Sequence, residues 1–212
     1  MAKLVFSLGQ YEGYRTTMGQ TEDNLLLPSE QRVFASEDDR FIFEDLVKAI
    51  DYASKQDIVS VEVLKGINGS MDSKQKGQPE HPGILRQNVK IRLGEYIPAA
   101  TVTESMVEEQ LNAITSNSVT SAWELFARIA KLQPFDNGNK RTALIAANLL
   151  YGSFKDSSRD ALSIPTDFKK LQFDTNLIYY YVADDLDDER PNVSESLENF
   201  VTFATQLTLQ SR

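Results

Sequence analysis

The sequence contains no cysteine and only one histidine, His81. The absence of cysteine excludes disulfide bonds, thiolate metal sites and a cysteine nucleophile. A single imidazole leaves no room for a histidine-rich metal centre and argues against a histidine-based catalytic triad. No segment approaches the length of a transmembrane span, and the apolar run at the N-terminus is too short for a signal peptide. We therefore expect a cytoplasmic protein that has no membrane partner.

Acidic residues outnumber basic ones, and the net charge of −9 disfavours binding to nucleic acid. The 212 residues are 41% hydrophobic and 25% charged, which is typical of an ordinary globular protein. A chain of this length can bury a sizeable core, either as one domain or as one domain with an appendage.

The N-terminal third shows few regular patterns. Residues 1–35 mix glycine, threonine and amide residues, so we expect an irregular N-terminal arm. A helix should follow, capped by Ser36 or Asp39. In residues 57–67, apolar residues alternate with polar ones, as in a strand, but some also recur at helical spacing. A strand and a helix therefore both remain possible for this segment. Residues 68–83 are a loop by composition.

One stretch predicts β structure. In "ILRQNVKIRLGEYIPAA", Val89, Ile91 and Leu93 alternate with charged residues before Gly94 allows a turn. This pattern is typical of a hairpin, which Pro98 should end.

From residue 101 onwards, helical patterns dominate. Thr103 is a plausible N-cap, Pro165 suits the first turn of a later helix, and the segment "RTALIAANLLYGSF" is apolar nearly all round, which predicts a buried central helix. The fold class is therefore all-α, with roughly six to eight helices and one hairpin.

The segment "LQPFDNGNKRTAL" combines features of an anion-binding turn. Gly138 allows a tight turn, Asn137 and Asn139 offer amide donors, and Lys140 and Arg141 add two cations at the start of the buried helix. The first turn of a helix has unpaired N–H groups and a favourable dipole for anions, and phosphate is the usual ligand. A polar connector with a solvated basic pair is the alternative.

The same segment resembles the signature of the Fic and Doc proteins, which have the mainly helical Fido fold. Pro134, Phe135 and the run 138–141 match that signature, and "HPG" at 81–83 with Arg86 matches the segment that precedes the family's β-hairpin flap. The resemblance covers roughly residues 40–180 and implies a hairpin flap over the active-site loop.

The resemblance implies that the chain divides into three parts. These are an N-terminal arm (1–35), a Fic/Doc core domain (36–185) and a C-terminal helix packed on the core (186–212).

The resemblance also implies an activity. Fic proteins transfer part of a nucleotide, most often AMP from ATP, to a hydroxyl of a target protein, whereas the Doc branch transfers phosphate. The expected cofactors are ATP or another nucleotide and Mg²⁺. The phosphates should lie on the loop of Asn137, Gly138, Asn139, Lys140 and Arg141. An antitoxin or other regulator is a candidate partner.

The flap is the expected binding place for the target protein. Its segment of Asn88, Val89, Lys90 and Ile91 should pair with an extended stretch of the target as an added strand.

Three positions depart from the family pattern. Gln133 stands at the position of the catalytic histidine, and an amide cannot accept a proton as a general base. Asn137 stands at the position of the metal-binding acid, so the metal ligand is expected to be Asn137 or the neighbouring Asp136. Leu144 stands where adenylylating members carry a second arginine, which Doc-like members also lack. Two hypotheses follow: an enzyme with impaired or altered transfer, or an inactive regulatory or protein-binding module.

Two further residues resemble functional residues of enzymes, but their sequence context favours a structural or surface role. His81 precedes a proline and a glycine, so we expect a turn or surface role. Glu198 lies in "SESLEN", which resembles an inhibitory motif of some Fic proteins, but the arginine with which that glutamate pairs is replaced by Leu144. We expect Glu198 to be a solvated helix residue.

Overall fold

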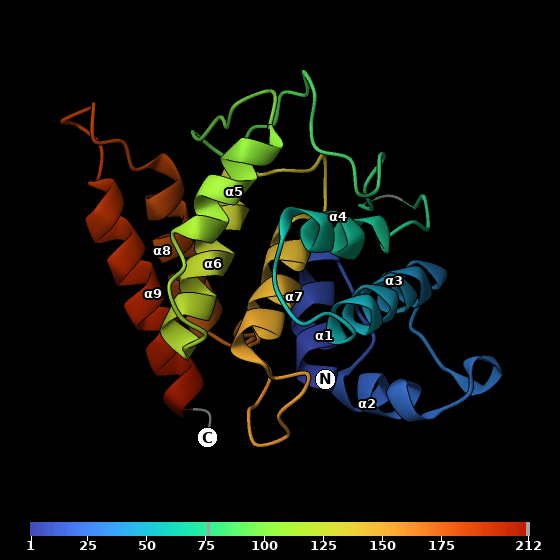
Figure 1. The fold of residues 1–212 in the computed structure, drawn as a ribbon. Helices are drawn as coiled ribbons and strands as arrows, with labels where there is room; N and C mark the ends of the chain where they lie inside the picture. The colour runs from blue at the N-terminus through green and yellow to red at the C-terminus, as the bar shows by residue number, and fades with distance from the viewer. Residues whose placement is uncertain (76, 211–212) are drawn as a thin grey trace.

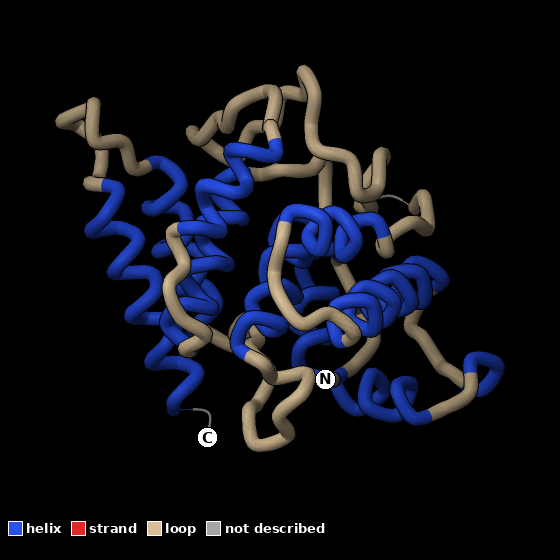
Figure 2. The backbone as a smooth tube through the Cα atoms, in the orientation of Figure 1, coloured by secondary structure: helices blue, strands red, loops and turns tan. Residues whose placement is uncertain are grey.

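The fold is seen in a computed structural model, which describes residues 1–75 and 77–210. This part of the chain contains helices and loops and no regular β-strand (Figures 1 and 2). The α-helices are α1 (Ala2–Gly9), α2 (Met18–Leu26), α3 (Glu37–Ser54), α4 (Val61–Gly69), α5 (Glu104–Asn112), α6 (Val119–Leu132), α7 (Asn139–Tyr151), α8 (Lys169–Val182) and α9 (Val193–Gln210). Short 3₁₀ turns lie at Gln10–Glu12 and Ser29–Gln31. The all-α prediction is confirmed.

Helices α6 and α7 form the centre of the molecule. They pack on each other, with α8 and α9 against α6, and with α3 and α4 against α7 (Figure 1). Helix α7 is buried along almost its whole length, as its apolar sequence predicts. No helix in the part of the chain described is both long and apolar enough to cross a membrane.

Aromatic side chains join α6 to α8 and α9. Trp123 and Phe126 of α6 pack against Phe173 of α8 and Phe200 of α9, with ring centroids 5.1–6.4 Å apart. The indole N–H of Trp123 donates to Thr208 Oγ1 at 2.9 Å, so this buried ring has its polar atom satisfied.

The N-terminal segment is helical, in contrast to the irregular arm predicted for residues 1–35. Leu4, Val5 and Leu8 of α1 are fully buried, so this helix belongs to the core. Helix α2 begins with a capping box, in which Thr17 and Gln20 bond to each other's backbone N–H groups. Helices α1 and α2 also explain why there are more helices than the six to eight expected.

Asp39 ties this segment to α3. Its Oδ2 accepts hydrogen bonds from the backbone N–H groups of Arg15 and Thr16 and from the Thr16 hydroxyl, at 2.5–2.9 Å. Ser36 caps α3, as predicted, by accepting from the Asp39 N–H. Burial by itself would raise the pKa of Asp39, but hydrogen bonds from Thr16, Arg15 and Ser36 outweigh it and lower the pKa.

One ambiguous segment is resolved, and the expected start of one helix is corrected. The segment 57–67, which suited either a strand or a helix, forms most of α4, capped by Ser60. Pro165 lies four residues before α8, which begins at Lys169, so it does not occupy the first turn.

The expected β-hairpin is not formed as two regular strands. Leu93 and Tyr96 make one antiparallel bridge around the turn, and the Val89 N–H donates to Ala100 O in the same register. That register places Ile91 opposite Pro98. Because proline has no N–H, the ladder is interrupted between the two contacts, and residues 86–102 form a folded-back loop.

Candidate functional site

The motif loop connects α6 to α7 through two left-handed residues. Gln133 ends α6 at φ 52°, and Gly138 precedes α7 at φ 75°. A Cβ on Gly138 would lie 3.0 Å from Met71 Cε and 3.1 Å from Asn68 Nδ2. Glycine is therefore required at position 138 by both the backbone angle and the space available.

Asn139 holds the loop in shape from the first position of α7. Its Oδ1 accepts from the Phe135 N–H at 2.8 Å, and its Nδ2 donates to Phe135 O and to Gln133 Oε1, each at 2.9 Å. The residue is 5% exposed. This predicted phosphate-binding side chain therefore faces into the loop, with both its oxygen and its nitrogen engaged there.

Gln133 has both side-chain atoms engaged within the protein. Its Nε2 donates to Ala130 O at 2.6 Å, and its Oε1 accepts from Asn139. The residue is 5% exposed. In this conformation the amide that replaces the motif histidine stabilises the end of α6 and is not presented to a substrate.

Arg86 links the loop 86–102 to the motif loop. Its backbone N–H donates to Pro134 O, its Nε donates to Gln133 O at 2.8 Å, and its Nη1 donates to Val89 O at 2.7 Å. The side chain is 2% exposed, and burial lowers its pKa. A buried guanidinium thus fixes the flap segment against the motif.

Asn68 of α4 holds the other side of the turn. Its Nδ2 donates to Asn137 O at 3.0 Å and its Oδ1 accepts from the Gly83 N–H at 2.9 Å. Asn137, in turn, uses its own Oδ1 to accept from the Gly138 N–H at 2.7 Å. The side-chain oxygen predicted to bind metal is therefore engaged in the turn itself.

Asp136 points away from this turn, towards His81. Its Oδ2 accepts from the His81 backbone N–H at 2.9 Å and lies 3.0 Å from His81 Nδ1. A one-residue shift along the loop thus separates the carboxylate from the side chain of Asn137.

The two cations of the motif meet the N-terminal segment. Arg141 is 1% exposed, and its Nη2 lies 3.2 Å from Glu12 Oε1 and donates to Gly77 O at 2.7 Å. The Lys140 ammonium lies 4.3 Å from the centre of the Tyr11 ring. Burial lowers the pKa of both Lys140 and Arg141, while burial raises the pKa of Glu12 against the opposing effect of these cations.

The predicted target-binding residues lie along the flap segment. Asn88, Val89 and Lys90 are exposed and Ile91 is half-buried. Asn88 adopts φ 57°, and its N–H donates to Thr101 Oγ1. Glu198, for which we expected a solvated helix position, is exposed on α9.

The arrangement described above is that of a Fic domain, with a polar turn and a helix N-terminus at its centre. The sequence model of the Fic/DOC family matches residues 44–151. The chain belongs to the Fic/DOC family.

Solved structures show the same fold. A fragment of Fic-1 from C. elegans superposes with a TM-score of 0.66 and 16% identity, over 99% of this chain. A Fic-domain-containing signaling protein from Bacteroides thetaiotaomicron VPI-5482 gives 0.65 and 15%, over 98% of this chain and 82% of its own. The chain spans 60% of the C. elegans structure. A comparison with curated protein sequences found no match.

Three residues around the site were not predicted as part of it. Tyr11 and Glu12 lie more than 120 positions before the motif, and no pattern in the sequence links them to it. Asn68 lies in an "NGS" segment that reads as an ordinary loop. Only the fold brings these three side chains to the motif.

Proposed function

We propose that the chain is a nucleotide-binding Fic domain related to protein adenylyltransferases. It would transfer AMP or phosphate from ATP, or another nucleotide, to a hydroxyl of a target protein, at a reduced or altered rate. The observation that carries this proposal is the turn ahead of α7, where Asn68 and Asn139 hold the backbone of Asn137 and Phe135 in a fixed shape.

The phosphates would lie at this helix start. The N–H groups in the first turn of a helix lack partners within the helix, and the helix dipole favours an anion there. Lys140 and Arg141 contribute positive charge next to the same turn. The target hydroxyl would enter along Asn88–Ile91, which lies on the outside of the loop joined to the motif by Arg86.

A reduced rate follows from Gln133. Its amide is engaged by Ala130 and Asn139, and it has no titratable proton. General-base catalysis contributes about 10²- to 10⁴-fold to a rate. A transfer that lacks this contribution should be slower by a factor of this order.

The Mg²⁺ expected from the family fits these residues poorly. The Asn137 oxygen is neutral and accepts from Gly138, and the Asp136 carboxylate faces His81. Mg²⁺ is bound through carboxylates and phosphates. We therefore assign no step of the reaction to a metal held by Asn137.

A second candidate function is an inactive regulatory or protein-binding module. It is favoured by two contacts of the motif cations: Glu12 neutralises Arg141, and the Tyr11 ring covers the Lys140 ammonium. Under this proposal, the partner would be a target or an antitoxin-like regulator that binds the flap. The cytoplasmic location stays a prediction.

Two measurements separate the candidates. The first is thermal unfolding with and without ATP and Mg²⁺, because a ligand that binds only the folded form raises the melting temperature. The second is transfer of radiolabel from ATP labelled at the α- or γ-phosphate to proteins of a lysate. Slow labelling supports the enzyme, whereas binding without labelling supports the module.

The pair of substitutions Gln133→His and Asn137→Asp tests the geometry of the site. If the turn holds a nucleotide, this variant should label target protein about 10²-fold faster or more, because it restores a base. Gln133→Asn with Asn137→Asp is the matched control, since it provides the acid without a base. If no variant is stabilised by ATP and none transfers label, the proposed phosphate site is refuted.

A further inference from the structure

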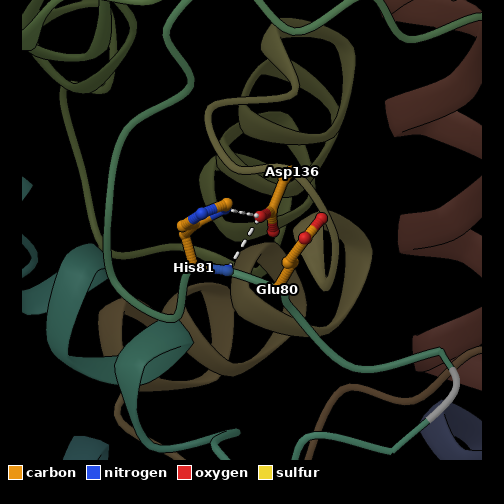
Figure 3. A group of neighbouring side chains, drawn as sticks. All are labelled: Glu80, His81 and Asp136. Carbon is orange, nitrogen blue, oxygen red and sulfur yellow. Dashed lines mark hydrogen bonds and ion pairs between the residues drawn. The ribbon is translucent and has the colours of Figure 1, made fainter.

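Three potential metal ligands converge beside the motif loop. Glu80 and His81, from the loop after α4, face Asp136 of the motif loop (Figure 3). One ligand atom of each residue lies within 4.8 Å of those of the other two. The His81 backbone N–H and ring both contact Asp136 Oδ2, so the imidazole and the carboxylate are held together by segments 55 residues apart.

Hydrogen bonds within the protein leave part of this cluster unexplained. Asp136 Oδ1 is buried and has no hydrogen-bond partner in the described part of the chain. A buried carboxylate oxygen without a donor is costly, and an ion held by both oxygens of this carboxylate would satisfy it. Glu80 is exposed and makes no hydrogen bond or ion pair with another described residue, so its carboxylate is available.

The cluster is accessible from one side. A groove of about 160 Å³ is lined by His81, Asp136 and the flap residues Ile84–Gln87 and Val89. An ion could therefore reach the cluster from solvent and keep one position for water or for a group of a bound molecule.

We propose that Glu80, His81 and Asp136 bind a divalent first-row transition ion of the Zn²⁺ class. One imidazole nitrogen and two carboxylate oxygens are ligands that Zn²⁺ uses, with a fourth position left for water. Mg²⁺ prefers oxygen ligands alone, so the histidine selects against it. The proposal concerns metal binding alone and does not depend on nucleotide binding or transfer.

The distances suit such an ion. Ligand bonds of about 2.0–2.2 Å in a tetrahedral site place neighbouring ligand atoms about 3.3 Å apart. His81 Nδ1 and Asp136 Oδ2 are already 3.0 Å apart. Glu80 alone has to approach, and its exposed side chain can do so by rotation.

The single histidine gives a direct test. Because His81 is the only imidazole in the chain and there is no cysteine, its ring signals in a proton NMR spectrum report binding at this site without competition from thiols. Titration with Zn²⁺ should shift these signals progressively until one equivalent of Zn²⁺ has been added. An excess of Mg²⁺ should leave the signals unchanged. Isothermal titration calorimetry on the same samples gives the affinity and the stoichiometry.

Substitutions assign the ligands. Glu80→Gln and His81→Asn should each weaken Zn²⁺ binding at least about tenfold, because changes even to groups behind the ligands cost 10- to 100-fold in affinity. Glu108→Gln, which removes the same charge from an exposed position on α5, should have no effect. Asp136→Asn should also abolish binding.

If Asp136→Asn fails to fold, Glu80→Gln decides, because the Glu80 side chain makes no hydrogen bond or ion pair with another described residue. The proposal is overturned if Zn²⁺ leaves the His81 signals unchanged. It is equally overturned if Glu80→Gln and Glu108→Gln weaken binding to the same extent, since binding would then reflect general surface charge.

Discussion

Replacement of Asn139 by alanine tests whether this side chain holds the motif loop. The substitution removes three hydrogen bonds, two of them to Phe135 and one to Gln133, in a place that is 5% exposed. Each such bond contributes about 1 kcal/mol, and a buried donor left unpaired costs about 1–3 kcal/mol. We expect the free energy of unfolding to fall by about 3–4 kcal/mol.

Urea denaturation followed by tryptophan fluorescence is the assay. Trp123 is the only tryptophan and is 1% exposed, so its emission reports the loss of the core. Asn112→Ala is the matched control, because Asn112 is exposed at the end of α5. We expect its stability to change by less than about 0.5 kcal/mol.

Asn139→Asp refines the same test. The aspartate keeps the oxygen that accepts from the Phe135 N–H but replaces the donor that faces Phe135 O and Gln133 Oε1. It should be destabilising by at least as much as alanine, because an oxygen then faces two acceptors. A loss below about 1 kcal/mol for both variants would refute the assigned role of Asn139.

Three further predictions concern other parts of the fold. Gly138→Ala should lower stability by about 1–2 kcal/mol, measured in the same urea assay, because of its positive φ and the close approach of Met71. Since the pKa of Asp39 is lowered in the folded state, its stabilisation is present above the ordinary carboxyl value of 3.8 and is lost as pH falls through the lowered value. Asp39→Asn should therefore show a shallower loss of stability than wild type in urea titrations between pH 5 and pH 2. Pro98→Val supplies an N–H opposite Ile91 and should slow hydrogen exchange across residues 89–100; unchanged exchange would contradict the register described.

The helical core could be predicted from the sequence because its signals are local. Apolar spacing and the caps Ser36 and Thr103 identify α3 and α5, and the apolar composition of residues 139–151 identifies the buried helix α7. The N-terminal helices were missed because glycines and amides obscured the periodicity. The capping box of Thr17 and Gln20 was the available signal for α2.

The position of the motif turn could be predicted, but its internal contacts could not. The sequence pattern identifies residues 133–141 as a turn before a helix, and the structure places them there. It does not reveal that Gln133 points inwards, because this depends on the left-handed backbone at the end of α6. Nor does it reveal the partners of Asp136 and Arg141, because His81 and Glu12 are distant in sequence and only packing brings them near.

The contacts of Tyr11 and Glu12 also bear on the order in which the molecule is made. Tyr11 donates to Asp174 Oδ1 at 2.6 Å, across 163 positions, and Glu12 contacts Arg141. Ribosomal synthesis releases residues 11–12 first, yet their partners emerge only after most of the chain has been translated. Such long-range contacts are slow to form. The motif turn therefore reaches its final surroundings late in biogenesis. A nascent chain stopped before α8 would have Lys140 next to a Tyr11 ring that Asp174 does not yet hold in place.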